Sequence, residues 1–109
     1  METKEVLAAL AAIAQESRLA IFRLLVQLGP DGMAATKIAE QLDIAPSSLS
    51  FHLKELTHAK LITFRNEGRF VIYSADVVAM NGLIGYLTEN CCGGIPCGPV
   101  NCGTTPSPT

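Results

Sequence analysis

The chain has 109 residues, 49% of them hydrophobic, and a formal net charge of -2. This length predicts one small domain with a limited ability to bury a core of its own, so dimerisation would fit. The start METKEV lacks the basic and apolar parts of a signal peptide, and no apolar run is long enough to cross a bilayer. We therefore expect a cytoplasmic protein with no membrane partner, in a compartment that keeps thiols reduced.

Two helices are predicted at the N-terminus. Apolar residues recur at helical spacing in residues 4–13, and the alanines there favour a helix. A second helix is predicted to begin after Ser17 as its N-cap and to end at Gly29-Pro30. The apolar side of the first helix consists of Val6, Leu7, Leu10 and Ile13.

A turn at Asp31-Gly32 leads into a predicted helix-turn-helix. The segment TKIAEQLDI predicts a helix of barely two turns. The next helix begins at Pro46, which suits a first helical turn, and it carries a buried stripe of leucines. Its N-terminal half shows mostly small or polar side chains in place of the usual strong helix formers: Ser47, Ser48, Ser50, Phe51, His52 and Lys54.

A β-hairpin and a last helix complete the predicted domain. Two runs of β-branched and aromatic residues flank the turn-forming Asn66-Glu67-Gly68, with Arg65 and Arg69 at the tip. Residues 76–89 return to helical periodicity, ended by Asn90 and Gly93-Gly94. No regular structure is expected from Gly93 onward. The fold class is therefore mainly α, in the order α-α-α-α-β-β-α, with a domain at 1–90 and a flexible cysteine-containing tail at 91–109.

This order of elements is the layout of a winged helix-turn-helix, and its charges favour DNA. Residues 47–75 hold four Lys or Arg against two carboxylates, whereas the rest holds four against eight. Short serine hydroxyls allow close approach to a major groove, and the wing arginines suit phosphates or the narrow minor groove. Any one of these residues is explained equally well as a cap or a solvated surface group. The whole arrangement is what favours DNA binding.

Three segments between Ser17 and Ser74 resemble the ArsR/SmtB family of bacterial metal-responsive repressors: SRLAIFRLL, KIAEQLDIAPSSLSFHLKEL and GRFVIYS. The resemblance implies a homodimeric winged-helix repressor that binds an imperfect inverted repeat in double-stranded operator DNA. It implies release of that DNA when an inducer binds. The dimer interface would use the first and last helices, in agreement with apolar stripes at Val6/Leu10/Ile13 and Met80/Leu83/Leu87.

All four cysteines lie in the last nineteen residues, at Cys91, Cys92, Cys97 and Cys102. In a reducing compartment such a cluster predicts a metal, metalloid or redox site more readily than a disulfide framework. Trivalent arsenic and antimony are soft and prefer three thiolates, by extension of the softness rule for metals. As(III) or Sb(III) is therefore the expected inducer, and no other cofactor is required.

The family resemblance narrows the inducer site to this cluster. The cysteine pattern that some members carry on the first helix of the helix-turn-helix falls here on Ala34, Thr36 and Ala39. The last helix has no histidine for a zinc-type site, and no N-terminal cysteine exists. YLTENCC resembles arsenite sensors whose site follows the last helix. That resemblance implies Cys91 and Cys92 as two ligands, with Cys97 preferred and Cys102 the alternative for the third.

Several other functions stay open for the cysteines. Four thiolates could hold Zn(II) or Cd(II), although adjacent cysteines with four-residue gaps match zinc spacings poorly. A redox switch needs nearby cations, and the tail has no Lys or Arg. A metalloid-buffering protein and a tail with incidental cysteines are further alternatives. An enzyme is not expected, because the sequence shows no phosphate-type anion loop and no cysteine in an electropositive setting.

Overall fold

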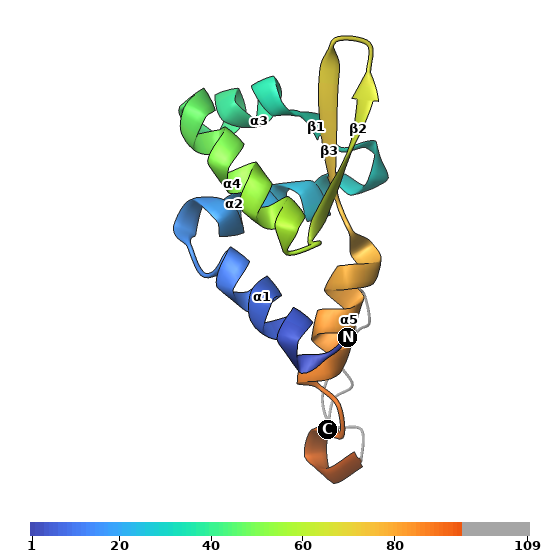
Figure 1. The fold of residues 1–109 in the computed structure, drawn as a ribbon. Helices are drawn as coiled ribbons and strands as arrows, with labels where there is room; N and C mark the ends of the chain where they lie inside the picture. Colours follow the sequence, from blue (N-terminus) through green and yellow to red (C-terminus); the bar gives the residue numbers. More distant parts are fainter. Residues whose placement is uncertain (95–109) are drawn as a thin grey trace, which may run out of the picture.

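The computed structural model describes residues 1–94, and it confirms the expected order of helices and hairpin (Figure 1). The described elements are α1 (Thr3–Ile13), α2 (Glu16–Leu28), the 3-10 turn η1 (Gly29–Asp31), β1 (Met33–Ala34), α3 (Ala35–Leu42), α4 (Pro46–His58), β2 (Ile62–Glu67), β3 (Phe70–Ala75), α5 (Val77–Leu87) and the 3-10 turn η2 (Cys91–Gly94). No helix within residues 1–94 is both long and apolar enough to span a membrane.

One hydrophobic core joins the helices and the base of the hairpin. Helix α2 contacts α1, α3, α4 and β3, so it lies at the centre of the fold. The largest fully buried side chains come from α2, α3, α4 and the junction into β2, and no polar side chain among residues 1–94 is buried. These side chains are Ile21, Leu25, Ile38, Leu56, Leu61 and Ile62. The predicted leucine stripe of α4 is part of this core.

The hairpin belongs to a three-stranded antiparallel sheet in the order β1-β3-β2. Glu67 pairs with Phe70, so the loop consists of Gly68 and Arg69 and lies later than the predicted turn at Asn66-Glu67-Gly68. Gly68 has a φ of 62°, a conformation that favours glycine in a tight hairpin loop. The strand β1 was not predicted from the sequence.

The segment before β1 differs from the predicted turn at Asp31-Gly32. Residues 29–31 form the 3-10 turn η1, which the backbone N–H of Gly32 closes by donating to Gly29 O at 3.2 Å. Gly32 has a φ of 66°. A Cβ at this position would collide with the backbone carbonyl of Tyr73 on β3. A glycine is therefore needed where the chain enters β1 close beside β3.

Two helix boundaries differ from the predictions. The prediction of Ser17 as N-cap was wrong: α2 begins at Glu16, and the N-cap is Gln15, whose Oε1 accepts the Arg18 backbone N–H at 2.8 Å. Helix α5 is capped by Asp76, whose Oδ1 accepts from the Ala79 backbone N–H at 3.0 Å. It ends at Leu87, two residues before the predicted end at Glu89.

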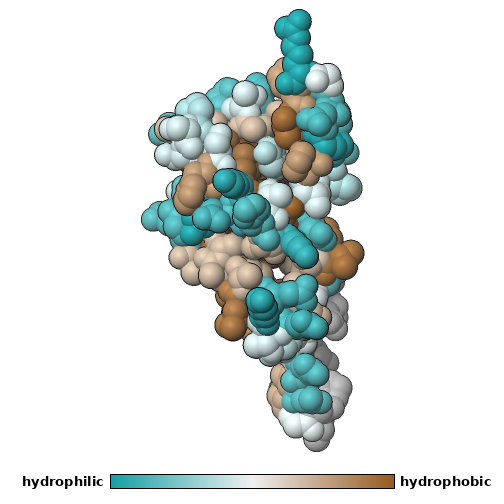
Figure 2. All heavy atoms as spheres, viewed as in Figure 1, coloured by the Kyte–Doolittle hydropathy of each residue, from teal (hydrophilic) through white to brown (hydrophobic). Residues whose placement is uncertain are grey.

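Helices α1 and α5 lie side by side at one end of the molecule (Figure 1). The hydroxyls of Thr3 and Tyr86 are hydrogen-bonded at 2.6 Å. The buried side of α1 is Val6, Ala9 and Ala12, whereas Leu7 of the predicted stripe is 61% exposed. Figure 2 shows apolar surface in this part of the molecule. The exposed large apolar residues of the two helices are Leu7, Val77, Val78, Ile84 and Leu87.

Candidate nucleic-acid interface and cysteine site

The outward side of α4 is the first candidate interface. Each residue of a helix turns by about 100°, which places Ser47, Phe51 and Lys54 on the side opposite the buried leucine stripe, and Ser48 and Ser50 on its two flanks. All five side chains are exposed. The N-cap of α4 is Ala45, and no side chain caps this helix. The expectation that serine hydroxyls are available at this end of the helix therefore agrees with the structure.

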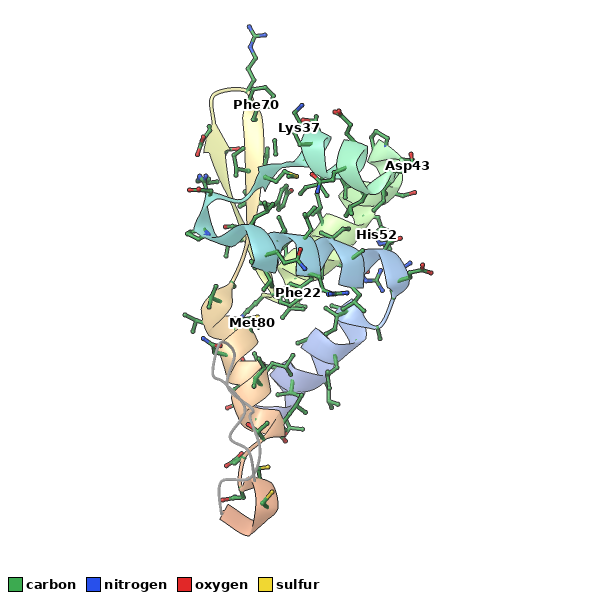
Figure 3. All side chains as sticks on the ribbon, turned by 180° about the vertical axis from the view of Figure 1, so that it is seen from behind. Phe22, Lys37, Asp43, His52, Phe70 and Met80 are labelled. Atoms are coloured by element: carbon green, nitrogen blue, oxygen red, sulfur yellow. The ribbon has the colours of Figure 1, made fainter. Side chains whose placement is uncertain are left out.

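Ser48 and His52 lie on a flank of α4 and not on its outward side. Ser48 is exposed, whereas His52 is half-buried beside α2 (Figure 3). The Nη1 of Arg18 lies 3.3 Å from His52 Nδ1, and the Nε of Arg18 donates to the carbonyl of Ala12 at 2.6 Å. One arginine of α2 thus connects the end of α1 to α4. A DNA contact by His52 stays a prediction.

Phe51 is the one large apolar side chain on the outward side of α4. It is 54% exposed. Its ring meets the His52 ring edge to face, with centroids 5.8 Å apart and planes at 61°. Such an arrangement is favourable for aromatic pairs. The ring therefore stands out from the helix with one neighbour that restricts its orientation.

The two wing arginines, predicted together, differ in their contacts. Arg65 donates from Nε to Glu67 Oε2 at 2.5 Å, from Nη2 to the Asp31 carbonyl at 2.9 Å and from Nη1 to the Pro30 carbonyl at 3.3 Å. Its guanidinium therefore holds β2 to η1. Arg69 lies in the hairpin loop beside Phe70, which marks the tip of the wing in Figure 3. Among residues 1–94 it has no hydrogen-bond or ion-pair partner, so it is the arginine free to meet a phosphate.

A hollow of about 450 Å³ separates α4 from the wing. Ser50 and Lys54 line it from the helix, and Phe64 and Tyr73 line it from the sheet. The two rings are in contact, with centroids 5.8 Å apart. The helix and the wing thus form two separate projections with a concave surface between them.

The cysteine site begins where α5 ends. Cys91 is half-buried, Cys92 is exposed, and their Sγ atoms lie 3.6 Å apart. Cys92 is disulfide-bonded in this structure, so ion binding would require the reduced form. Gly93 and Gly94 belong to η2, but the left-handed φ values of Cys92 (55°) and Gly93 (69°) show that this turn is not a regular helix, which agrees with the expectation of no regular structure from Gly93.

The remaining predicted ligands, Cys97 and Cys102, lie outside the described residues. Within residues 1–94, no group of three or more His, Cys, Asp and Glu side chains is arranged to hold a metal ion. Two of the predicted ligands, Cys91 and Cys92, thus lie within the described residues, and the three-ligand site stays a prediction.

Comparisons with known proteins identify the family. A model described as a helix-turn-helix domain matches residues 13–64. The chain is 35% identical over 81 residues to an arsenical resistance operon repressor of Bacillus subtilis, covering 74% of this chain and 73% of that protein. The chain belongs to the ArsR family. The family and fold are those of DNA-binding transcriptional regulators and not of enzymes.

Two further similarities fit the ArsR assignment. A putative arsenical resistance operon repressor ArsR of Halobacterium salinarum is 34% identical over 79 residues, which span 67% of this chain but only 60% of that protein. A homodimeric winged helix-turn-helix DNA-binding domain of Mycobacterium bovis, a possible ArsR-family regulator, superimposes with a TM-score of 0.64 at 26% identity. That comparison covers 80% of this chain and 81% of the other.

Sequence reasoning missed one residue that supports the candidate interface from inside the fold. Arg18 was not a candidate, yet it contacts both His52 and the backbone of α1. The position of Arg18 in a helix does not indicate its role in the sequence, because its partner His52 lies 34 residues away. The available hint was an arginine placed directly after a polar helix start.

Proposed function

We propose that this ArsR-family chain is a repressor that binds operator DNA as a dimer and dissociates when As(III) or Sb(III) binds its C-terminal cysteine thiolates. DNA binding has the strongest support. The outward side of α4 bears Ser47 and Lys54, and Ser50 lies on the flank that faces the projecting β-wing, which is how a recognition helix and wing approach a duplex. This arrangement, in a chain 35% identical to a named repressor, is the observation on which the proposal rests.

Dimerisation is supported by the surface of α1 and α5. Leu7, Val78 and Leu87 are 61%, 81% and 58% exposed, an unusual amount of apolar surface for one end of a small domain. The similar Mycobacterium bovis domain is a homodimer. Two copies joined through α1 and α5 would present two α4 helices to successive turns of one face of the DNA.

The inducer proposal is supported by the two neighbouring cysteines and their place in the fold. Cys91 and Cys92 lie four and five residues after Leu87, the end of α5, which is the helix proposed for the dimer interface. The Thr3–Tyr86 hydrogen bond connects the end of α5 to the start of α1. At the other end, the Asp76 backbone N–H donates to the Leu61 carbonyl at 2.8 Å, next to the end of α4. An ion that draws the cysteines together would act on α5, and through these contacts on the dimer and on α4.

The third ligand is proposed as Cys97, with Cys102 as the alternative. Doubling the length of the loop to be closed costs only about 0.6 kcal/mol, or roughly threefold in population. The preference for the nearer cysteine is therefore small. Zn(II) or Cd(II) bound by more of the thiolates is the competing inducer chemistry.

The test is a binding titration with labelled DNA from the gene's own promoter. The fully reduced protein is bound to the DNA, and anisotropy is followed as arsenite, antimonite or Zn(II) is added. Release by arsenite or antimonite but not by zinc is expected. Release by zinc alone would overturn the inducer proposal, and a protein that never binds the promoter would overturn the repressor proposal.

Serine variants locate the site in the same assay. Cys91→Ser and Cys92→Ser should each retain DNA binding but abolish release by arsenite, since a three-thiolate site loses one ligand. Cys97→Ser should behave in the same way. Cys102→Ser is the matched control and should respond as the wild type does. If arsenite no longer released DNA from the Cys102→Ser protein, the third ligand would instead be Cys102.

A further inference from the structure

We propose that Phe51 reads thymine in the operator by apolar contact with the 5-methyl group in the major groove. The inference rests on the proposed DNA binding and adds a base preference to it. Thymine is the only base that presents a methyl group in the major groove, and a phenylalanine ring is among the side chains that can contact it. A ring without donors or acceptors cannot read the other base edges by hydrogen bonding.

The position of Phe51 on α4 is the first observation that supports contact with a base. It lies in the N-terminal half of α4, the part of a recognition helix that approaches base edges. Ser47 and Lys54 share its side of the helix, and both are exposed. Glu55 also lies on that side, one turn after Phe51, and offsets the charge of Lys54, so the short exposed serine in the first turn, and not a net positive charge, suits this side to approach DNA.

The restricted orientation of the Phe51 ring is the second observation that supports contact with a base. Phe51 is 54% exposed, yet its ring contacts the His52 ring at a centroid distance of 5.8 Å. His52 in turn lies 3.3 Å from the guanidinium of Arg18, which is fixed to the Ala12 carbonyl. A ring whose orientation is already restricted by a neighbouring side chain loses less conformational freedom on binding than an unrestrained ring. Arg18 and His52 thus act as positioning residues for Phe51.

The test removes methyl groups from the DNA without changing base pairing. Each thymine of the bound promoter segment is replaced in turn by deoxyuridine, symmetrically in both half-sites where these can be recognised. The dissociation constants of the wild type and Phe51→Ala are then measured by anisotropy. For the wild type we expect one position per half-site at which deoxyuridine weakens binding about fourfold per methyl, which corresponds to ~0.8 kcal/mol. Phe51→Ala should bind the thymine and deoxyuridine duplexes equally at that position.

Two controls separate reading from folding. Ser47→Ala changes the same side of α4 and should keep the deoxyuridine effect. The thermal midpoint of Phe51→Ala should match that of the wild type within a few degrees, because the ring is half exposed. The inference is overturned if no thymine replacement weakens wild-type binding, or if the sensitive position stays equally sensitive in Phe51→Ala. A wild-type protein that binds none of these duplexes would instead overturn the proposed function itself.

Discussion

The recognition helix α4 and the β-wing are held in place by different kinds of contact. Helix α4 buries Leu49, Leu53 and Leu56, each at most 3% exposed, so the hydrophobic core fixes its position. In β2 only the first residue, Ile62, is buried, and the strand is exposed from Thr63 onward. Beyond its base the wing is held by backbone pairing with β3 and by the contacts of Arg65 with η1.

This difference indicates that the two candidate DNA contacts are fixed with unequal strength. Removing core side chains of α4 should affect the whole fold, because the domain unfolds as one cooperative unit. Changes in the wing should loosen only the hairpin, since exposed backbone hydrogen bonds and few buried contacts mark regions of low local stability. Substitutions in the helix and in the wing should therefore differ both in size and in how far their effects spread.

The largest effect is expected for Leu56→Ala in α4. Leu56 is fully buried, and removing a buried leucine typically lowers the free energy of unfolding by about 2–5 kcal/mol. Urea denaturation followed by circular dichroism, at one protein concentration, measures the change. Ser47→Ala on the exposed side of the same helix is the control and should shift stability by about 0.5 kcal/mol or less. If Leu56→Ala lowered the free energy of unfolding no more than Ser47→Ala does, the hydrophobic core would not be what fixes α4.

Gly32→Ala should be next in size, because it acts at the base of the wing. Its added Cβ would collide with the Tyr73 carbonyl, and its φ of 66° is unfavourable for alanine. We expect a loss of ~2 kcal/mol or more in the same denaturation experiment. Gly68→Ala at the tip has a φ of 62° but no atom within 4 Å of the new Cβ, so it should cost only about 1 kcal/mol. Equal losses for the two variants would show that the close approach at Gly32 has no effect.

Arg65→Ala should have a smaller and more local effect. The arginine is exposed, so the loss of overall stability should be about 1 kcal/mol or less. Hydrogen exchange should nevertheless accelerate in β2, since the variant loses the two contacts to η1. Arg65→Lys should not restore protection, because one ammonium group cannot reproduce the fork of the guanidinium. Unchanged exchange in Arg65→Ala would refute the role given to this residue.

Arg69→Ala should have the smallest effect on stability of these variants. It should weaken DNA binding without changing the fold. Its unfolding midpoint and β2 exchange should equal those of the wild type. If Arg69 meets a phosphate in the proposed complex, the slope of log affinity against log salt should fall by about 0.9 for each phosphate that is no longer neutralised. Titrations at several salt concentrations measure this slope. A slope equal to that of the wild type would remove Arg69 from the interface.

The order of helices and the hairpin could be predicted because apolar periodicity and turn residues are local signals. The strand β1 could not, since its two residues become a strand only by pairing with Ile72 and Tyr73, almost forty positions later. Ser17 was preferred as N-cap because serine is the commoner cap, yet Gln15 takes that role. In α1, local spacing could not distinguish the buried alanines from the exposed Leu7.

For the candidate interface, the spacing of leucines predicted the buried side of α4 correctly. It gave no account of Arg65 and His52, because their partners in η1 and α2 are brought near only by the fold. The cysteine site is described by its first two members alone. The assignment of Cys97 or Cys102 as third ligand stays a prediction.

Helix α5 contains Gly82 and Gly85 in its interior. Each glycine makes a helix less favourable than alanine by about 1 kcal/mol, and nothing among residues 1–94 lies within 4 Å of a Cβ added at Gly85. The helix next to Cys91 is therefore the one whose backbone should open most readily while the core stays folded, and its amide protons should exchange before those of α4. A ligand held by the cysteines would then be sensed as a change in how often this helix opens.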